Sequence, residues 1–265
     1  ASHPEMFLDE KGKYDPARHH FSHTAVGVPG SVAGLYLAHQ RLGRLPWKKL
    51  LEPAVKLAGS GFRVSPGLAA DLAGRLGSFK KYPATLEQFS KETGASKAGE
   101  LLVQKDLAET LRRIQDQGAE GFYRGKTAEL LVAEMQRGGG LVSLKDLRSY
   151  KAIERQPIRG TFRGLDIISM PPPSSGGVAL VEMLNLLELG GIAAAGFRSP
   201  REVHLLAEAM RRAYADRARH LADTDFVKVP VERLISKDYA RTLSATINPQ
   251  KASRSSPTTF TWPSQ

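Results

Sequence analysis

A short run of prolines, serines and glycines, PPPSSGG at residues 171–177, constrains the fold of this chain more than any other feature. Three consecutive prolines fix φ and exclude a helix until they end. The residues before them, 158–170, are rich in Ile, Phe and Thr with two glycines, and predict a β-hairpin or two short strands. The residues after them, about 177–189, are apolar and predict a helix. The run therefore predicts a tight corner between a strand and a helix.

Two interpretations of this corner stay open from the residues alone. Gly176 and Gly177 let the backbone turn into a helix whose first N–H groups have no partners, and such a helix start can hold an anion or an oxyanion. The run is no P-loop, because no Gly-Lys-Ser/Thr follows, and no nucleophile elbow, because the required glycine two places before the serine is absent. A structural corner with Ser174 or Ser175 as N-cap is favoured over a ligand-facing loop. Ser31, which follows Pro29 and Gly30, is interpreted as an N-cap on the same grounds.

Most of the remaining chain has the period of amphipathic helices. Ser143 is predicted to cap a helix with Asp146 in its first turn, and Pro53 is expected to kink or divide its helix. The predicted helices cover residues 31–43, 46–59, 104–118, 126–140, 143–150 and 199–223. A short sheet is expected around residues 22–28 and 158–170. The simplest organisation is a single domain over residues 1–265, with an exposed, mobile tail at about 248–265.

Composition excludes several classes of protein. The chain holds 38 Lys and Arg against 27 Asp and Glu, a net charge of +11. Acidic residues sit among most of the basic ones, so nucleic acid binding is not expected. The densest basic cluster, on the helix predicted over 199–223, is interpreted as a solvated face with Glu208 and Asp216 nearby; its members are Arg211, Arg212, Arg217 and Arg219. The chain has no cysteine, no apolar run long enough to span a membrane, and no secretory signal in its first twenty residues.

No other constellation predicts catalysis or metal binding. His19, His20 and His23 have a spacing that suits a metal ion, but no HExxH motif or cysteine accompanies them, and a surface loop is favoured. His204 is interpreted as a packing or surface residue. Asp223 and Asp225 are interpreted as a helix end and turn, because the glycine and glutamate of an EF-hand loop are absent. The residues alone therefore assign no catalytic residue, no metal ligand and no cofactor.

Several longer stretches nevertheless carry a resemblance over almost the whole chain. They include MFLDEKGKYDP near the start, MPPPSSGG at the corner, and YADR followed by LADTDFVKVP. In order and spacing they resemble the large subunit of the gamma-glutamyltranspeptidases, or glutathione hydrolases. The resemblance implies a helix-dominated α+β chain that is the large-subunit portion of an αββα N-terminal-nucleophile hydrolase sandwich. It also implies a proenzyme that cleaves itself, with a threonine at the start of the small subunit as nucleophile and its own α-amine as base.

The chain departs from the family pattern in ways that bear on activity. The Arg-Glu motif that binds substrate and the Thr-Thr-His-aromatic motif that holds the nucleophile are both missing, and Phe260 follows Thr258 and Thr259 where the histidine is expected. We therefore expect a part of the large subunit, truncated at both ends and inactive alone, with a small-subunit-like partner or self-association. The corner residues Ser174, Ser175, Gly176 and Gly177 are expected near the shared site, mainly as scaffold.

Two alternatives stay open. One is a non-enzymatic binding or regulatory module that holds a glutathione-like ligand, and the other is one half of a split enzyme. The family is typically periplasmic or extracellular, and the missing secretory signal leaves a cytoplasmic location open as well.

Overall fold

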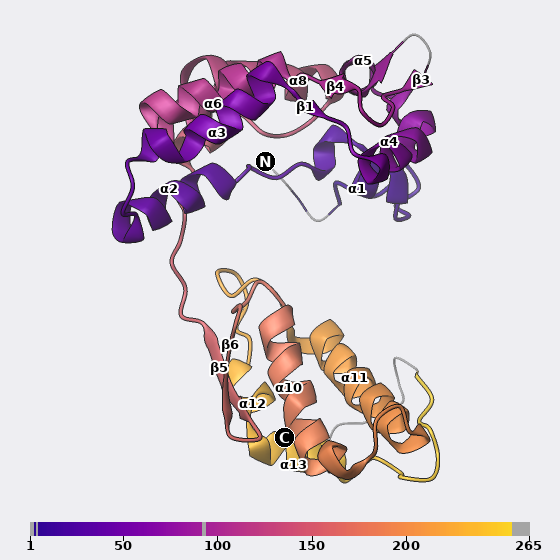
Figure 1. Ribbon diagram of the computed structural model, residues 1–265. Coiled ribbons are helices and arrows are strands. Elements are labelled where there is room, and N and C mark those ends of the chain that lie inside the picture. Colours follow the sequence, from indigo (N-terminus) through magenta and orange to yellow (C-terminus); the bar gives the residue numbers. More distant parts are fainter. Residues whose placement is uncertain (1–2, 4, 92–93, 256–265) are drawn as a thin grey trace. The chain divides into compact units, whose positions relative to one another are not determined.

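The structure is a computed structural model that describes residues 3, 5–91 and 94–255. Contacts within the chain group it into two compact units, Ala1–Ile153 and Glu154–Gln265, which are described separately. Helices dominate both units, and strands are short (Figure 1). The single domain expected over residues 1–265 stays a prediction. No helix among the described residues is long and apolar enough to cross a membrane.

Unit 1 is built from helices that pack around a small apolar core. Strand β1 pairs with β4 and β2 pairs with β3, both antiparallel and two residues long. The core residues are Tyr123, Ala128, Val132, Met135, Val142 and Leu147. The elements are α1 Pro16–Phe21, η1 His23–Ala25, α2 Ser31–Leu42, α3 Trp47–Ser60, β1 Phe62–Arg63, α4 Pro66–Phe79, α5 Pro83–Phe89, β2 Ser90–Lys91, β3 Gly94–Ala95, β4 Leu101–Leu102, α6 Lys105–Gln117, α7 Glu120–Tyr123, α8 Gly125–Gly138 and α9 Leu144–Ser149.

Local signals predicted one helix start in unit 1 correctly and another incorrectly. The Ser143 side chain accepts from the Asp146 N–H and the Asp146 carboxylate bonds back to the Ser143 backbone, so the predicted cap is confirmed as a full capping box. Ser31 is not an N-cap. Gly30 holds that position, and it leaves no room for a side chain, since a Cβ there would overlap the hydroxyl of Tyr150.

One further expectation in unit 1 was wrong, and another was wrong in part. Residues 22–28 form no strand, because the N–H groups of Ala25 and Val26 bond back to the carbonyls of Ser22 and His23 in a local turn instead of a ladder. Pro53 does not divide its helix, because α3 runs from Trp47 to Ser60 through it, and a kink at Pro53 stays a prediction. The one hydrogen bond that a proline removes is outweighed there by the packing of α3 against α6.

Unit 2 begins with the predicted hairpin. Strands β5 (Ile158–Phe162) and β6 (Leu165–Ser169) pair antiparallel from Ile158 opposite Ser169 to Phe162 opposite Leu165. The two turn residues, Arg163 and Gly164, both have positive φ (51° and 81°), as a two-residue hairpin turn of the favoured twist requires. The remaining elements are α10 Gly176–Leu189, η2 Ile192–Ala194, α11 Pro200–His220, α12 Val231–Leu234 and α13 Lys237–Ser244.

Helix α10 is the centre of unit 2. It packs against the hairpin, α11 and α13 (Figure 1). Most of its residues are buried. The close approach of the hairpin depends on Gly160, where a Cβ would contact the Val181 side chain at 2.6 Å. The core members of this unit are Ile158, Val178, Val181, Leu186, Leu187, Ala209, Leu234, Tyr239, Ala240 and Leu243.

The core role of α10 can be tested with two leucines on the same helix. Leu186 is 1% exposed and Leu189 is 42% exposed. We expect Leu186→Ala to lower the free energy of unfolding of unit 2 by about 2–5 kcal/mol, because a cavity forms where the side chain was. Leu189→Ala should change it by roughly 0.5 kcal/mol or less. Hydrogen exchange of the α10 amides measures both, and equal effects of the two variants would contradict this core.

Candidate functional site

The corner at residues 171–177 is a closely packed strand-to-helix connection. Ser175 occupies the N-cap position of α10 but makes no side-chain cap bond, and the Ser174 hydroxyl instead accepts from the Gly176 N–H at 3.3 Å. Gly177 lies against the backbone of Met170, and a Cβ at this position would overlap the Met170 carbonyl oxygen. The absence of a side chain at Gly177 therefore lets α10 begin directly against the end of β6.

The two serines of the corner make no hydrogen bond to a general base among the described residues. The Ser175 hydroxyl accepts a 2.8 Å hydrogen bond from Nε of Arg217, on α11. A guanidinium keeps its protons in proteins and has no acceptor, so it cannot take the proton of a hydroxyl. Within the described part of the chain, no histidine bonds to Ser174 or Ser175. A scaffold role for the corner and a substrate-binding role for Ser174, Ser175, Gly176 and Gly177 both stay predictions.

A glycine pair tests the packing of this corner. A Cβ at Gly176 would meet only the Ser174 hydroxyl at 3.5 Å, whereas a Cβ at Gly177 would overlap backbone. We expect Gly177→Ala to destabilise unit 2 by about 1–3 kcal/mol, the usual cost of overpacking. Gly176→Ala should be neutral or slightly stabilising, because alanine favours a helix over glycine. Urea unfolding followed by circular dichroism measures both, and a neutral Gly177→Ala would contradict the corner geometry.

The arginine-rich helix α11 is not the solvated face that its sequence suggested. Arg212, Glu208 and Asp216 are each 0% exposed. Their spacing of four places them on one side of the helix, the side that packs into unit 2. Arg211 is only partly exposed, and its guanidinium also turns toward Glu208. The interpretation as a solvated face was wrong for Arg212, Glu208 and Asp216.

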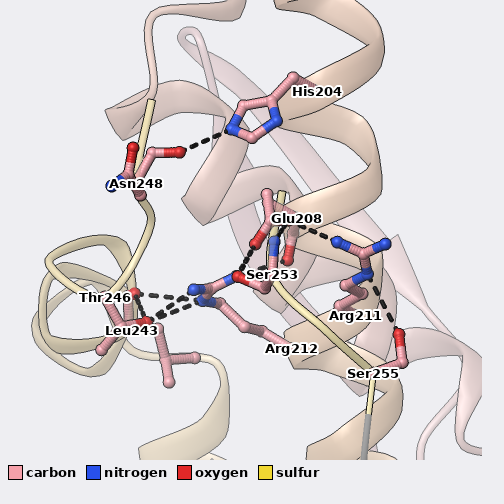
Figure 2. Close-up of polar contacts among 9 residues, drawn as sticks. All are labelled: His204, Glu208, Arg211, Arg212, Leu243, Thr246, Asn248, Ser253 and Ser255. Atoms are coloured by element: carbon pink, nitrogen blue, oxygen red, sulfur yellow. Dashed lines mark hydrogen bonds and ion pairs between the residues drawn. The ribbon is translucent and has the colours of Figure 1, made fainter. Parts of the chain in front are cut away.

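Glu208 is a buried carboxylate held by four donors (Figure 2). Its Oε1 accepts from Nη1 of Arg211 (2.6 Å) and from the backbone N–H of Ser253 (2.9 Å), and its Oε2 accepts from Nη1 of Arg212 (2.7 Å) and from the Ser253 hydroxyl (2.6 Å). Burial alone would raise the pKa of Glu208, but the hydrogen bonds from Ser253 and Arg212 lower it to about 2. Glu208 is therefore ionised across the whole neutral range.

Arg212 connects this carboxylate to the end of α13. Its Nε donates to the carbonyl oxygen of Leu243 (3.2 Å), and its Nε and Nη2 donate to the hydroxyl of Thr246 (3.0 and 2.8 Å). Carbonyls in the last turn of a helix have no partner inside the helix, so a cation satisfies them there. Arg212 thus joins α11 to the end of α13 and pairs with Glu208 at the same time.

A second buried cluster lies at Asp216, one turn further along α11. The hydroxyl of Tyr239 donates to Asp216 at 2.8 Å, and Nε2 of His220 lies 3.7 Å from the same carboxyl. Burial and the neighbouring charge of Asp216 raise the pKa of Glu182, on α10, to about 9. Glu182 is therefore protonated at neutral pH and shares its proton with Asp216, whose own pKa burial also raises. Tyr239 and His220 face the Asp216 carboxyl of this pair.

Because Glu182 keeps its proton in the folded chain, the free energy of unfolding depends on pH. The direction of that dependence follows from the raised pKa of Glu182. The pKa of Glu182 is higher in the folded chain than in the unfolded one, so between about pH 5 and pH 9 the folded chain binds more protons. Stability should therefore fall as pH rises through this window, by up to about 1.4 kcal/mol per pH unit for one proton. Glu182→Gln cannot ionise and still offers N–H donors to Asp216, so we expect a flatter profile.

Urea unfolding of both chains at a series of pH values measures this slope. The exposed Glu232→Gln is the matched control and should keep the wild-type profile. A Glu182→Gln variant whose profile runs parallel to the wild type would overturn the shared proton.

The other candidate metal-binding residues from the sequence each form hydrogen bonds or ion pairs with one or two nearby side chains among the described residues. Nε2 of His23 lies 2.7 Å from Glu134, and the Tyr14 hydroxyl contacts both His19 and His20. In the ranges that the structure describes, no group of three or more potential metal-ligating side chains comes together. Within unit 2, Arg155 pairs with Asp225 at 2.6 Å and lies 4.0 Å from Asp223. Thr258, Thr259 and Phe260 lie outside the described residues.

Comparisons with known proteins assign the family. The family model described as gamma-glutamyltranspeptidase matches residues 1–265. The glutathione hydrolase proenzyme of Escherichia coli K12 is 44% identical over 254 residues, which is 95% of this chain and 44% of that protein. The acylase ACY 1 proenzyme of Pseudomonas sp. SE83 is 41% identical over 251 residues, or 94% of this chain and 45% of that protein. The chain spans less than half the length of these curated relatives.

Comparison with a solved structure indicates the same family. The gamma-glutamyltranspeptidase of Helicobacter pylori superposes with a TM-score of 0.93 at 41% identity, covering 96% of this chain and 73% of that one. The fold is thus that of N-terminal-nucleophile hydrolases of this type, and the helix-dominated α+β class with short sheets is confirmed. The chain belongs to the gamma-glutamyltranspeptidase family.

Proposed function

We propose that this polypeptide supplies large-subunit scaffold to an enzyme that transfers or hydrolyses γ-glutamyl groups. The observation that carries the proposal is the match over the whole chain, with 44% identity to a protein named glutathione hydrolase and a TM-score of 0.93 to a gamma-glutamyltranspeptidase. Similarity at this level supports the same architecture and the same class of chemistry. The scaffold role is supported by the corner, which brings α10 and α11 together through Arg217 and Ser175 without a base.

We further propose that the 265-residue chain is inactive by itself. No Thr-Thr-His run occurs in its sequence, and Thr258-Thr259 is followed by Phe260. Ser175, the hydroxyl with the most defined contact at the corner, accepts from a guanidinium and bonds to no base among the described residues. The nucleophile would come from a partner chain that begins with threonine, whose α-amine would serve as base. The alternative, a binding module for a glutathione-like ligand, needs no such partner.

Hydrolysis of a chromogenic γ-glutamyl anilide tests this proposal. The purified chain should show no turnover above the rate of its Thr258→Ala variant, because loss of a nucleophile with its base removes several powers of ten in rate. Turnover should be restored by mixing with two pieces of a relative, a small subunit that begins Thr-Thr-His and the large-subunit segment that carries the Arg-Glu motif. Thr258→Ala should be restored equally.

Two outcomes would contradict the proposal. Turnover by the isolated wild-type chain that Thr258→Ala abolishes would place the nucleophile in this polypeptide. Failure of any partner chain to restore activity, together with saturable binding of glutathione to the isolated chain, would favour the binding module.

A further inference from the structure

A pocket of about 450 Å³ opens on the surface of unit 1. It is lined by the N-terminal turn at Met6 and Phe7, by residues 24–28, and by the connection between α8 and α9 at Leu141 and Val142. Its walls are mainly apolar, and its volume lies in the range that small-molecule sites occupy. Every residue of this lining lies in unit 1, so the pocket belongs to that unit alone.

The wall at residues 24–28 is held close to the end of α8. A Cβ at Gly138 would overlap the ring of His23, and a Cβ at Gly140 would meet the His23 carbonyl oxygen at 3.0 Å. These two glycines therefore allow a closer approach than a residue with a side chain would. Nε2 of His23 lies 2.7 Å from Glu134, on α8, and this contact fixes the turn that precedes the wall.

The wall at the N-terminal turn has fixed contacts as well. The ring centroids of Phe7 and His19 lie 4.4 Å apart. The Phe7 carbonyl oxygen accepts a 2.8 Å hydrogen bond from the N–H of Asp15, the residue that caps α1. Because both walls are held by such contacts, the pocket is preformed, and a ligand has little of the chain to order when it binds.

The backbone of residues 26–28 offers hydrogen-bonding groups to this pocket. These residues form neither a helix nor a strand. No described residue donates to their carbonyl oxygens, and none accepts from the N–H of Gly27 or Val28. A polar group of a bound ligand therefore finds backbone partners along this wall.

Asp146 supplies the charge of the pocket. Among the described residues that line it, no other is ionisable. The hydroxyl and the N–H of Ser143 both donate to Oδ2 of Asp146, at 2.6 and 2.9 Å, and no described residue donates to Oδ1. These two bonds lower the pKa of Asp146, so its carboxylate is ionised at neutral pH. The capping box of α9 thus holds a negative charge at the exposed rim, with one oxygen left for a ligand.

We propose that this pocket binds a small molecule that has an apolar body and a protonated amine. The apolar body lies against side chains such as Met6, Phe7 and Leu141, and the ammonium group donates to Oδ1 of Asp146. An anionic ligand of the same shape meets a like charge at the rim, so charge complementarity selects the amine. The site goes beyond the proposed function, because it requires neither a partner chain nor a γ-glutamyl substrate.

Three indole compounds that differ mainly in their end group test this site. Tryptamine ends in an ammonium group, tryptophol in a hydroxyl and indole-3-propionate in a carboxylate. Each is titrated into the full chain, and the amide shifts of Val28 and Val142 in proton–nitrogen NMR spectra report binding at the pocket. We expect tryptamine to bind about fivefold more tightly than tryptophol, which is the gain from one ion pair near the surface. Indole-3-propionate should bind more weakly than both.

Two variants separate the charge from the cavity. Asp146→Asn removes the charge and keeps an oxygen that accepts from Ser143, so tryptamine and tryptophol should bind within about twofold of each other. Gly27→Leu adds a side chain at a lining glycine where a Cβ would meet nothing within 4 Å, so all three compounds should bind about tenfold more weakly or worse. Gly67→Leu is the matched control and should bind all three as the wild type does, because Gly67 is an exposed, equally unobstructed glycine of α4 outside the pocket.

Gly27→Leu leaves Asp146 and its capping box in place, so it decides the location of the site even if Asp146→Asn does not fold. Equal affinities of the three compounds for the wild type would overturn the choice of an amine. Wild-type affinity in Gly27→Leu, or Val28 and Val142 amides that do not shift at millimolar concentrations of any compound, would overturn the pocket as a binding site. The titration uses no partner chain, so none of these results bears on the proposed function.

Discussion

The buried ion pair between Glu208 and Arg212 is the interaction on which the arrangement of unit 2 depends. Both side chains are fully buried, and a buried charge is tolerated only where hydrogen bonds replace its water. Helix α11 cannot supply all of those bonds itself. The end of α13 provides acceptors to Arg212, and Ser253 provides donors to Glu208. Two segments that follow α11 in sequence are thereby fixed against it.

The carboxyl groups of Glu208 and Asp216, both on α11, have pKa shifts in opposite directions. Glu208 is surrounded by donors and stays ionised, whereas Asp216 faces the carboxyl of Glu182 and shares a proton with it. Neither side chain is exposed to solvent, and the hydrogen bonds from Ser253 and Arg212 outweigh the effect of burial on the pKa at Glu208, whereas burial dominates at Asp216. Unit 2 thus has a polar seam through its core, and this seam, rather than apolar packing alone, defines where α13 and residues 246–255 lie. Under the proposed function, the seam would belong to the scaffold that receives the nucleophile-bearing chain.

The sequence predicted the elements whose signals are local. The hairpin, the start of α11 at Ser199 and the capping box at Ser143 each depend on a few neighbouring residues, and the structure confirms them. It did not predict that Arg212 is buried, because a Glu and an Arg four residues apart look the same on a solvated face and in a core. Nor did it predict the bond from Arg217 to Ser175, which joins residues 42 positions apart. Ala209 and Ala213, small residues beside Glu208 and Arg212, are the one signal that could have indicated close packing on that face.

Carboxyl 13C NMR of the glutamate-labelled chain, followed from pH 2 to pH 10, tests the polar seam most directly. The account predicts that the Glu208 signal titrates well below the usual range of glutamate and that the Glu182 signal is still protonated at pH 7. The assignments come from the Glu208→Gln and Glu182→Gln spectra. If both carboxyl groups titrate together near pH 4.5, as solvated glutamates do, the buried pair and the shared proton are both wrong.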